Sequence, residues 1–160
     1  MAAPRPPADA VVALRGLTRR FRGLFAGLED DERPEDVALR PGADGRSALD
    51  HVVGATHVLA SLGRGVQRAL VEDGPLVEPA PPVAAGATGP VEARLAELDD
   101  TAQALAARIE HVPAADWART VRVSDREGST TALDLLWEAV DGAVAQLRAT
   151  ERVLAEVRQR

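Results

Sequence analysis

The sequence contains three histidines, His51, His57 and His111. Histidine is the residue type that proteins use most for acid–base chemistry near neutral pH. A helix that binds a metal ion through two histidines places them four residues apart, and no two of these histidines have that spacing. The histidines therefore give little indication of a metal site. His111 precedes Pro113 at an expected helix end, where the helix dipole favours a cation.

His57 shares a helical face with other positions of interest. Asp50, Gly54, His57 and Ser61 recur at steps of four, three and four residues, which is one side of an α-helix. A second row with similar steps comes late in the chain and consists of Asp134, Glu138, Asp141, Ala145 and Arg148. Both rows fit solvated polar faces. If they face each other instead, a carboxylate would orient His57 as a general base that needs no metal.

The other chemistry-bearing patterns are few. Trp117 and Trp137 are the large apolar anchors, and we expect them in the core or in a pocket wall. Gly63 and Gly65 fit close helix packing or a kink, because no strand precedes them and the other residues of a phosphate loop are missing. The absence of cysteine excludes disulfides, thiolate metal ligands and cysteine nucleophiles.

The composition narrows the class of protein further. The chain has 160 residues, a formal net charge of −6 and 2% aromatic residues. Nucleic-acid binders carry basic patches or aromatic platforms, so we expect no nucleic-acid partner. No window approaches the roughly 18 apolar residues of a membrane span, and residues 1–10 lack the apolar stretch of a targeting signal. We therefore expect a cytoplasmic protein without a membrane partner.

Apolar residues at three- and four-residue steps predict four amphipathic helices. We place them at residues 9–28, 47–72, 90 to just before Pro113, and 131–158. Asp9 is the expected N-cap of the first helix, and capping-box spacings start the second helix at Ser47 and the fourth at Thr131. The stretch from residue 29 to 45 is expected to be a loop, as is 73–89, which is rich in Pro, Ala and Gly. Residues 117–123 fit a short extended segment.

These elements predict an all-α protein, a single four-helix bundle over residues 1–160 with residues 1–8 as a flexible tail. Each amphipathic helix needs another helix against which to bury its apolar stripe. The long second connection indicates that the bundle is not a simple up-and-down pair of hairpins.

Three segments resemble the DinB-like superfamily of helical bundles, in its actinobacterial, mycothiol-transferase-like branch. They are RSALDHVVGATHVL at 46–59, DWARTVRVSD at 116–125 and TALDLLWEAVDGAVAQL at 131–147. Their order along the chain also fits, and the resemblance covers about residues 40–154. It implies a four-helix bundle of the DinB type, in a family that includes metal-dependent thiol transferases and mycothiol-dependent isomerases.

The resemblance also implies that the metal site has been lost. Three histidines bind a divalent metal at one end of the bundle in that family, and their positions fall here on Gly54, Asp141 and Ala145. The family's tryptophan before the helix-capping serine falls on Arg46. One carboxylate is too few for a stable metal site, so we expect no metal and no cofactor. The smaller residues are expected to leave room for an organic ligand.

Our leading hypothesis is a DinB-like bundle that binds, or binds and converts, a small organic molecule without a metal. His57 and Asp141 would form the acid–base pair. The remaining ligand-binding residues would be Asp50, Gly54, Ser61, Trp117, Trp137, Glu138 and Ala145. One alternative is a metal-dependent thiol S-transferase of the mycothiol type that uses His57, Asp141 and Glu138 as ligands for Zn²⁺ or Ni²⁺. The other is a non-catalytic homodimeric interaction protein.

Overall fold

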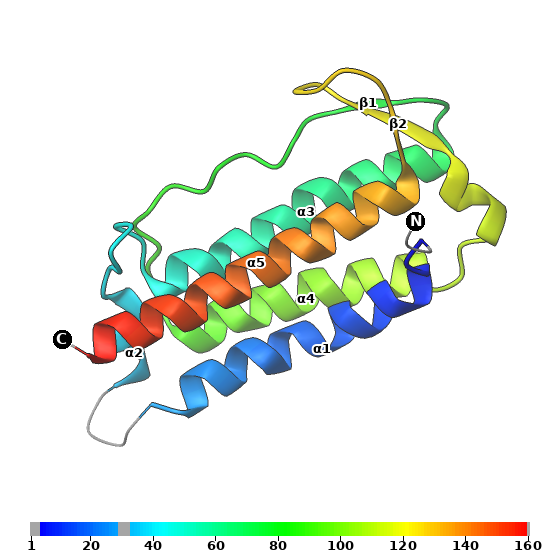
Figure 1. Ribbon diagram of the computed structural model, residues 1–160. Helices are drawn as coiled ribbons and strands as arrows, with labels where there is room; N and C mark the ends of the chain where they lie inside the picture. The colour runs from blue at the N-terminus through cyan, green and yellow to red at the C-terminus, as the bar shows by residue number, and fades with distance from the viewer. Residues whose placement is uncertain (1–3, 29–32, 160) are drawn as a thin grey trace.

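The computed structural model of the protein describes residues 4–28 and 33–159. Four long helices lie side by side, with a short helix at one end of the bundle and a small sheet at the other (Figure 1). The long helices are α1 (Pro7–Ala26), α3 (Ala48–Val71), α4 (Val91–Ile109) and α5 (Ala132–Arg158). The expected four-helix bundle is confirmed. No helix in the described part of the chain is long and apolar enough to cross a membrane.

Two of the helix starts follow the expected capping residues. The hydroxyl oxygen of Ser47 accepts a hydrogen bond from the backbone N–H of Asp50 at 3.1 Å, and the Asp50 carboxylate accepts one from the Ser47 N–H at 2.8 Å. This reciprocal pair satisfies two backbone donors that a helix start leaves without partners. Thr131 caps α5 with one half of this arrangement: its hydroxyl oxygen accepts from the Asp134 N–H at 3.1 Å, and its hydroxyl donates to the Asp134 carboxylate at 2.7 Å.

Two predictions near the N-terminus were wrong. The first helix begins at Pro7 rather than Asp9, because a proline in the first turn gives up a backbone donor that has no partner there anyway. The stretch expected to be a loop contains a further helix, α2 (Pro34–Leu39), which also starts at a proline. It forms because Val37 and Ala38 are completely buried against the bundle, a gain that local sequence signals do not reveal.

The directions of the helices explain the long connection in the middle of the chain. Residues in contact show that α3 runs antiparallel to α5, with Gly54 near Gln146 and Gly65 near Leu135. By contrast α3 and α4 run parallel, so the segment between them must return along the whole bundle (Figure 1). The expectation that the bundle is not a pair of simple hairpins is confirmed.

The core is continuous between the four helices. Its largest fully buried side chains include Leu14, Phe21, Leu59, Leu98 and Leu136, so every long helix contributes. The contact between α3 and α5 is the most extensive. It depends on glycine, because a Cβ built on Gly142 would lie 2.8 Å from the Cγ1 of Val58.

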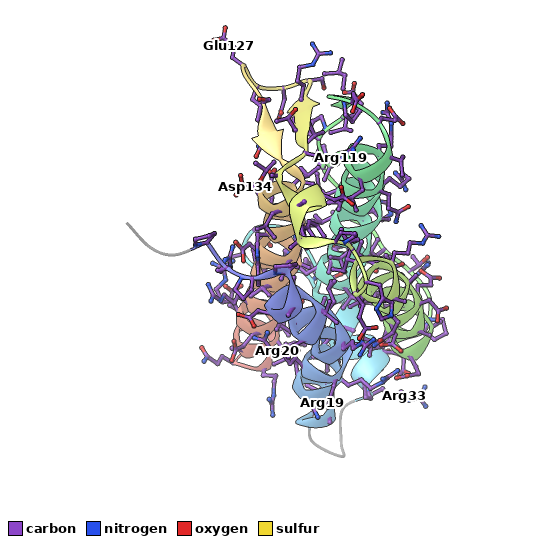
Figure 2. The ribbon with its side chains drawn as sticks, turned by 90° about the vertical axis from the view of Figure 1, so that its right-hand side faces the viewer. Arg19, Arg20, Arg33, Arg119, Glu127 and Asp134 are labelled. Atoms are coloured by element: carbon purple, nitrogen blue, oxygen red, sulfur yellow. The ribbon has the colours of Figure 1, made fainter. Side chains whose placement is uncertain are left out.

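A small sheet, which the sequence analysis did not predict as such, covers one end of the bundle. Its strands are β1 (Leu76–Val77), β2 (Thr120–Val123) and β3 (Thr130–Thr131), preceded by the 3₁₀ helix η1 (Ala114–Ala118). The central strand β2 pairs in parallel with β1 and antiparallel with β3. Of the expected extended segment at 117–123, residues 120–123 are a strand. Seen along the bundle axis, the connection from β2 to β3 projects beyond the helices, with Glu127 near its tip (Figure 2).

Candidate functional site

An open pocket of about 550 Å³ lies at the start of α5, where the segment before α1 passes over it. Figure 2 labels Asp134 in this region, at the end of α5 nearest the sheet. The volume of the pocket is in the range of small-molecule sites. It is lined by Pro4, Arg5, Leu133, Asp134, Trp137, Glu138, Asp141 and Gly142.

Helical periodicity explains why α5 brings these side chains together. Trp137 and Glu138 lie three and four residues after Asp134, and Asp141 lies four and three residues after them, spacings that bring side chains side by side on a helix. The opposite face, which includes Leu135, Leu136 and Ala139, is completely buried in the core. The core therefore fixes the rotation of α5, and that rotation turns the acidic and aromatic row outward.

The segment before α1 supplies a cation to this row. The guanidinium of Arg5 donates two hydrogen bonds to the carboxylate of Asp141, at 2.9 and 2.6 Å, and lies 3.8 Å from the centre of the Trp137 ring system. The indole N–H of Trp137 donates to the backbone carbonyl of Arg5 at 3.0 Å. One arginine thus makes an ion pair, a cation–π contact and a main-chain contact in the same pocket.

The three carboxylates of the pocket differ in the groups that pair with them. The hydrogen bonds from Arg5 hold the pKa of the Asp141 carboxyl below its usual value and outweigh burial, which acts in the opposite direction. Glu138 is paired with Arg126 through two hydrogen bonds, of 2.8 and 3.0 Å. The Asp134 carboxylate accepts one hydrogen bond, from the hydroxyl of its capping partner Thr131, but pairs with no cation among residues 4–28 and 33–159.

His57 does not join this pocket. Its side chain is exposed on α3 and makes no hydrogen bond or ion pair within the described ranges, whereas Asp141 is bound to Arg5. Ser61 lines a separate, smaller hollow with Arg64 and Val77. Ala145 is exposed on α5. The structure therefore brings together Trp137, Glu138 and Asp141 from the expected set.

Asp50 is a structural residue in this fold. It is 3% exposed, and besides its contacts with Ser47 its carboxylate accepts hydrogen bonds from the backbone N–H groups of Gly86 and Ala87, at 2.9 and 2.7 Å. Burial by itself raises the pKa of Asp50, but these donors outweigh it and leave the pKa below its usual value. Asp50 thus fastens the long connection to the start of α3.

The space beside Gly54, where the sequence analysis expected room for a ligand, is filled from α5. A Cβ built on Gly54 would lie 3.0 Å from the amide oxygen of Gln146. The same oxygen is 2.8 Å from Nδ1 of the buried His51, so the glycine makes room for a hydrogen-bonded pair. Trp117 is likewise part of the core, with 5% of its surface exposed.

The donor atoms present do not fit a divalent metal ion. Within residues 4–28 and 33–159, no group of three or more His, Cys, Asp or Glu side chains is placed to hold one. The two pocket carboxylates closest in sequence, Glu138 and Asp141, are each occupied by an arginine. A metal would have to displace both guanidinium groups and would still lack a nitrogen donor from His57.

Two residues of the site were missed by the sequence analysis, Arg5 and Arg126. Neither stands in a periodic pattern, since both belong to segments that connect or precede helices. Arg5 carries one local signal, because it lies between Pro4 and the pair Pro6 and Pro7. Prolines restrict the backbone to an extended form, which suits a segment that packs across a surface.

Comparisons with known proteins agree with the fold. Residues 13–141 match the sequence profile of the family described as the DinB superfamily. The fold is similar to that of YfiT from Bacillus subtilis, which is described as a probable metal-dependent hydrolase with an unusual four-helix bundle topology. The two share 13% sequence identity with a TM-score of 0.73, over 95% of this chain and 89% of that one. No curated protein matches the sequence.

Proposed function

The chain belongs to the DinB superfamily, and from that premise we propose that it is a member that binds a small organic molecule without a metal ion. The binding site is the pocket at the start of α5. Trp137, Glu138 and Asp141 are the residues that contact the ligand. The observation that carries the proposal is the combination of a pocket of about 550 Å³ with an aromatic and acidic lining on a rigid helix.

The lining of the pocket supports binding of an organic molecule. Trp137 offers a flat apolar surface and its neighbours offer hydrogen-bond acceptors, which is the mixture that small-molecule sites use for affinity and orientation. The residues stand on a long helix whose other face is packed in the core, so their positions are fixed before a ligand arrives.

The pocket of the proposal differs from the space beside Gly54. Gln146 occupies that space, and the described residues offer no fitting set of metal donors, which removes the reason to place a cation there. His57 lies outside the proposed site because it makes no hydrogen bond or ion pair with Asp141 in the described chain. A catalytic step would therefore use the pocket carboxylates as its acid and base groups.

A metal-dependent hydrolase is the second candidate, because YfiT is described as a probable one. In this chain such an enzyme would have to use Glu138 and Asp141 after loss of their arginine partners. Metal analysis of the purified protein separates the two functions. A tightly bound divalent ion near one equivalent per chain would favour the hydrolase.

The proposal is tested by titrating the ¹⁵N-labelled protein with a library of small cationic, neutral and anionic compounds in the presence of a chelator. The chain has 2 tryptophans, so the indole region shows two signals, and Trp137→Phe assigns the one in the pocket. We expect saturable shifts of the Trp137 signal while that of Trp117 stays unchanged. Binding that needs added metal, or no binding from any compound class, would reject the proposal.

A matched pair of variants locates the ligand. Asp141→Asn removes the charge of the pocket residue that contacts Arg5, whereas His57→Ala removes an exposed side chain with no described partner. We expect the first variant to change the affinity of the selected compound and the second to leave it unchanged. If His57→Ala changes the affinity and Asp141→Asn does not, the ligand binds beside His57 instead.

A further inference from the structure

The segment before α1, residues 4–6, covers the proposed pocket; we call it the N-terminal arm. Two of its residues, Pro4 and Arg5, are part of the pocket wall, and the Arg5 side chain rests on Trp137 and Asp141. The arm therefore occupies the Trp137 face and the Asp141 carboxylate, which a ligand of the proposed pocket would contact. What holds it there indicates what else the pocket accepts.

The contacts of Arg5 are the contacts of a recognition site for an organic cation. A carboxylate accepts two parallel N–H donors, which selects a planar guanidinium, and an indole face stabilises the positive charge above it. The indole N–H anchors the arm through its main chain. The contacts of the Arg5 side chain with Asp141 and Trp137 involve only its guanidinium group. A free molecule with a guanidinium group can therefore make the same contacts.

The arm is held weakly enough to be displaced. The side chains of Arg5 and Asp141 are 51% and 56% exposed, and ion pairs that remain open to water contribute little because solvent and salt screen them. The arm has no hydrogen bond to the rest of the bundle besides those at Asp141 and Trp137, within the described residues and apart from the first turn of α1. Its release exposes the pocket without unfolding a helix.

Charge determines which ligand takes the place of the arm. When Arg5 leaves, Asp141 loses its hydrogen-bonded cation, and Asp134 in the same pocket pairs with no cation in the part of the chain that the structure describes. Arg148 attracts Asp141 at longer range, and Arg126 remains committed to Glu138. A neutral or anionic ligand would not replace the positive charge that Arg5 supplied to these carboxylates, whereas a cationic ligand would replace it.

We propose that Arg5 is an internal competitor for the pocket, and that the ligand is a small organic cation whose guanidinium or ammonium group displaces it from Trp137 and Asp141. This inference rests on the proposed function, since it names the ligand class and the regulation of that same pocket. A closed arm lowers the apparent affinity by the fraction of molecules in which the pocket is open.

The test uses three small aliphatic probes: agmatine, which carries a guanidinium and an ammonium group, as the cation, valeramide as the neutral compound and valerate as the anion. Each is titrated by calorimetry and by the Trp137 indole signal into the wild-type protein, Arg5→Ala and Arg15→Ala, with the purification tag at the C-terminus. Arg15 is the matched control, because it is an exposed arginine of α1 whose ion pair is with Glu110, outside the pocket. Circular dichroism checks that the variants keep the fold.

We expect Arg5→Ala to bind agmatine at least about tenfold more tightly than the wild type, as follows if the arm is closed about nine-tenths of the time. Arg15→Ala should bind like the wild type, and Asp141→Asn in the Arg5→Ala background should lose the gain. Saturation with agmatine should also move the wild-type Trp137 signal towards its position in Arg5→Ala, because the arm is released in both and the indole N–H then loses the backbone carbonyl of residue 5.

Two results would overturn the inference, and they differ in what they say about the proposed function. If Arg5→Ala binds agmatine no more tightly than Arg15→Ala, or if valeramide and valerate gain as much as agmatine, the pocket is not a competitive cation site. The proposed function then survives as long as any compound saturates the Trp137 signal. If no probe and no library compound binds to any variant, both fail.

Discussion

The carboxylate of Asp141 and the guanidinium of Arg5 are joined by two hydrogen bonds across 136 positions of the sequence. Asp141 stands where the family resemblance places a metal ligand. It already binds a cation, the guanidinium of Arg5, which belongs to the same chain. The ion pair connects the first described residues to the N-terminal half of the last helix. Its consequences can be measured through pH, stability and metal content.

The first prediction concerns the titration of Asp141. Arg5 lowers the pKa of this carboxyl below its ordinary value of 3.8, so the arm is held above that value and released as the pH falls through the lowered pKa. We expect Arg5→Ala to return the pKa of Asp141 towards 3.8, measured by NMR titration of the side-chain carboxyl carbon. Arg15→Ala should leave it unchanged. An equal pKa in the wild type and Arg5→Ala would mean that the pair does not form in solution.

The second prediction concerns Asp50. Asp50→Ala removes the hydrogen bonds to Ser47, Gly86 and Ala87, and we expect a loss of about 3 kcal/mol in the free energy of unfolding, because hydrogen bonds to a buried charge are among the strong ones. Proteolysis within residues 78–90 should accelerate. Urea denaturation measures the first effect, with Asp100→Asn on the exposed side of α4 as a control.

The contribution of Asp50 should also depend on pH with a defined sign. Because its folded pKa lies below the ordinary value of 3.8, the stabilisation is complete above that pH and is lost as the pH falls through the folded value. The difference in stability between the wild type and Asp50→Ala should therefore shrink in strongly acidic buffer. A difference that stays constant down to the folded pKa would contradict an ionised Asp50.

The third prediction concerns the close contact of α3 and α5. Gly142→Ala places a methyl group 2.8 Å from Val58, and overpacking of a core costs about 1–3 kcal/mol. We expect a net loss of stability, because the gain in helix propensity from alanine is only about 1 kcal/mol. Gly16→Ala is the matched control, since its added Cβ meets no atom within 4 Å and should stabilise the protein.

A double-mutant cycle shows whether Val58 is the cause. Combined with Val58→Ala, the substitution Gly142→Ala should lose most of its penalty, because the smaller side chain removes the clash. Thermal denaturation of the four proteins measures the coupling. If the two substitutions are additive, the helices approach each other less closely in solution than they do here.

The fourth prediction concerns metal. The described residues offer no set of three donors, so we expect protein purified without a chelator to hold far less than one divalent ion per chain. Addition of Zn²⁺ or Ni²⁺ should leave the melting temperature unchanged, because a ligand that binds the folded state raises it. Elemental analysis and thermal denaturation check the two statements, and a metal-induced rise in melting temperature that Asp141→Ala abolishes would contradict them.

Local signals account for the features that were predicted correctly. Ser47 and Asp50 stand three residues apart before an apolar run, and this spacing alone identifies the start of α3. The apolar stripes of the four long helices likewise identify a bundle without knowledge of which helices touch. The outward row on α5 that includes Asp134, Glu138 and Asp141 follows from the same periodicity.

The features that were missed depend on residues far apart in the sequence. Gly54 suggested open space, but the side chain of Gln146 fills it from another helix. Asp50 shared a helical face with His57, yet the long connection covers the first and leaves the second exposed. The cation on Asp141 comes from an arm that has no periodic pattern of its own. Pairings of this kind require the folded arrangement of the chain.

The arrangement of the helices has one more consequence. The most extensive contacts of both α1 and α3 are with α4 and α5, so the two long helices before the central connection lie diagonally across the bundle from each other. Neither half of the chain can bury its apolar stripes within itself. Two fragments separated within residues 78–90 would thus be complementary, each unfolded alone and folded when mixed. The two halves of the chain therefore depend on each other as the subunits of an obligate heterodimer do, and residues 78–90 connect them.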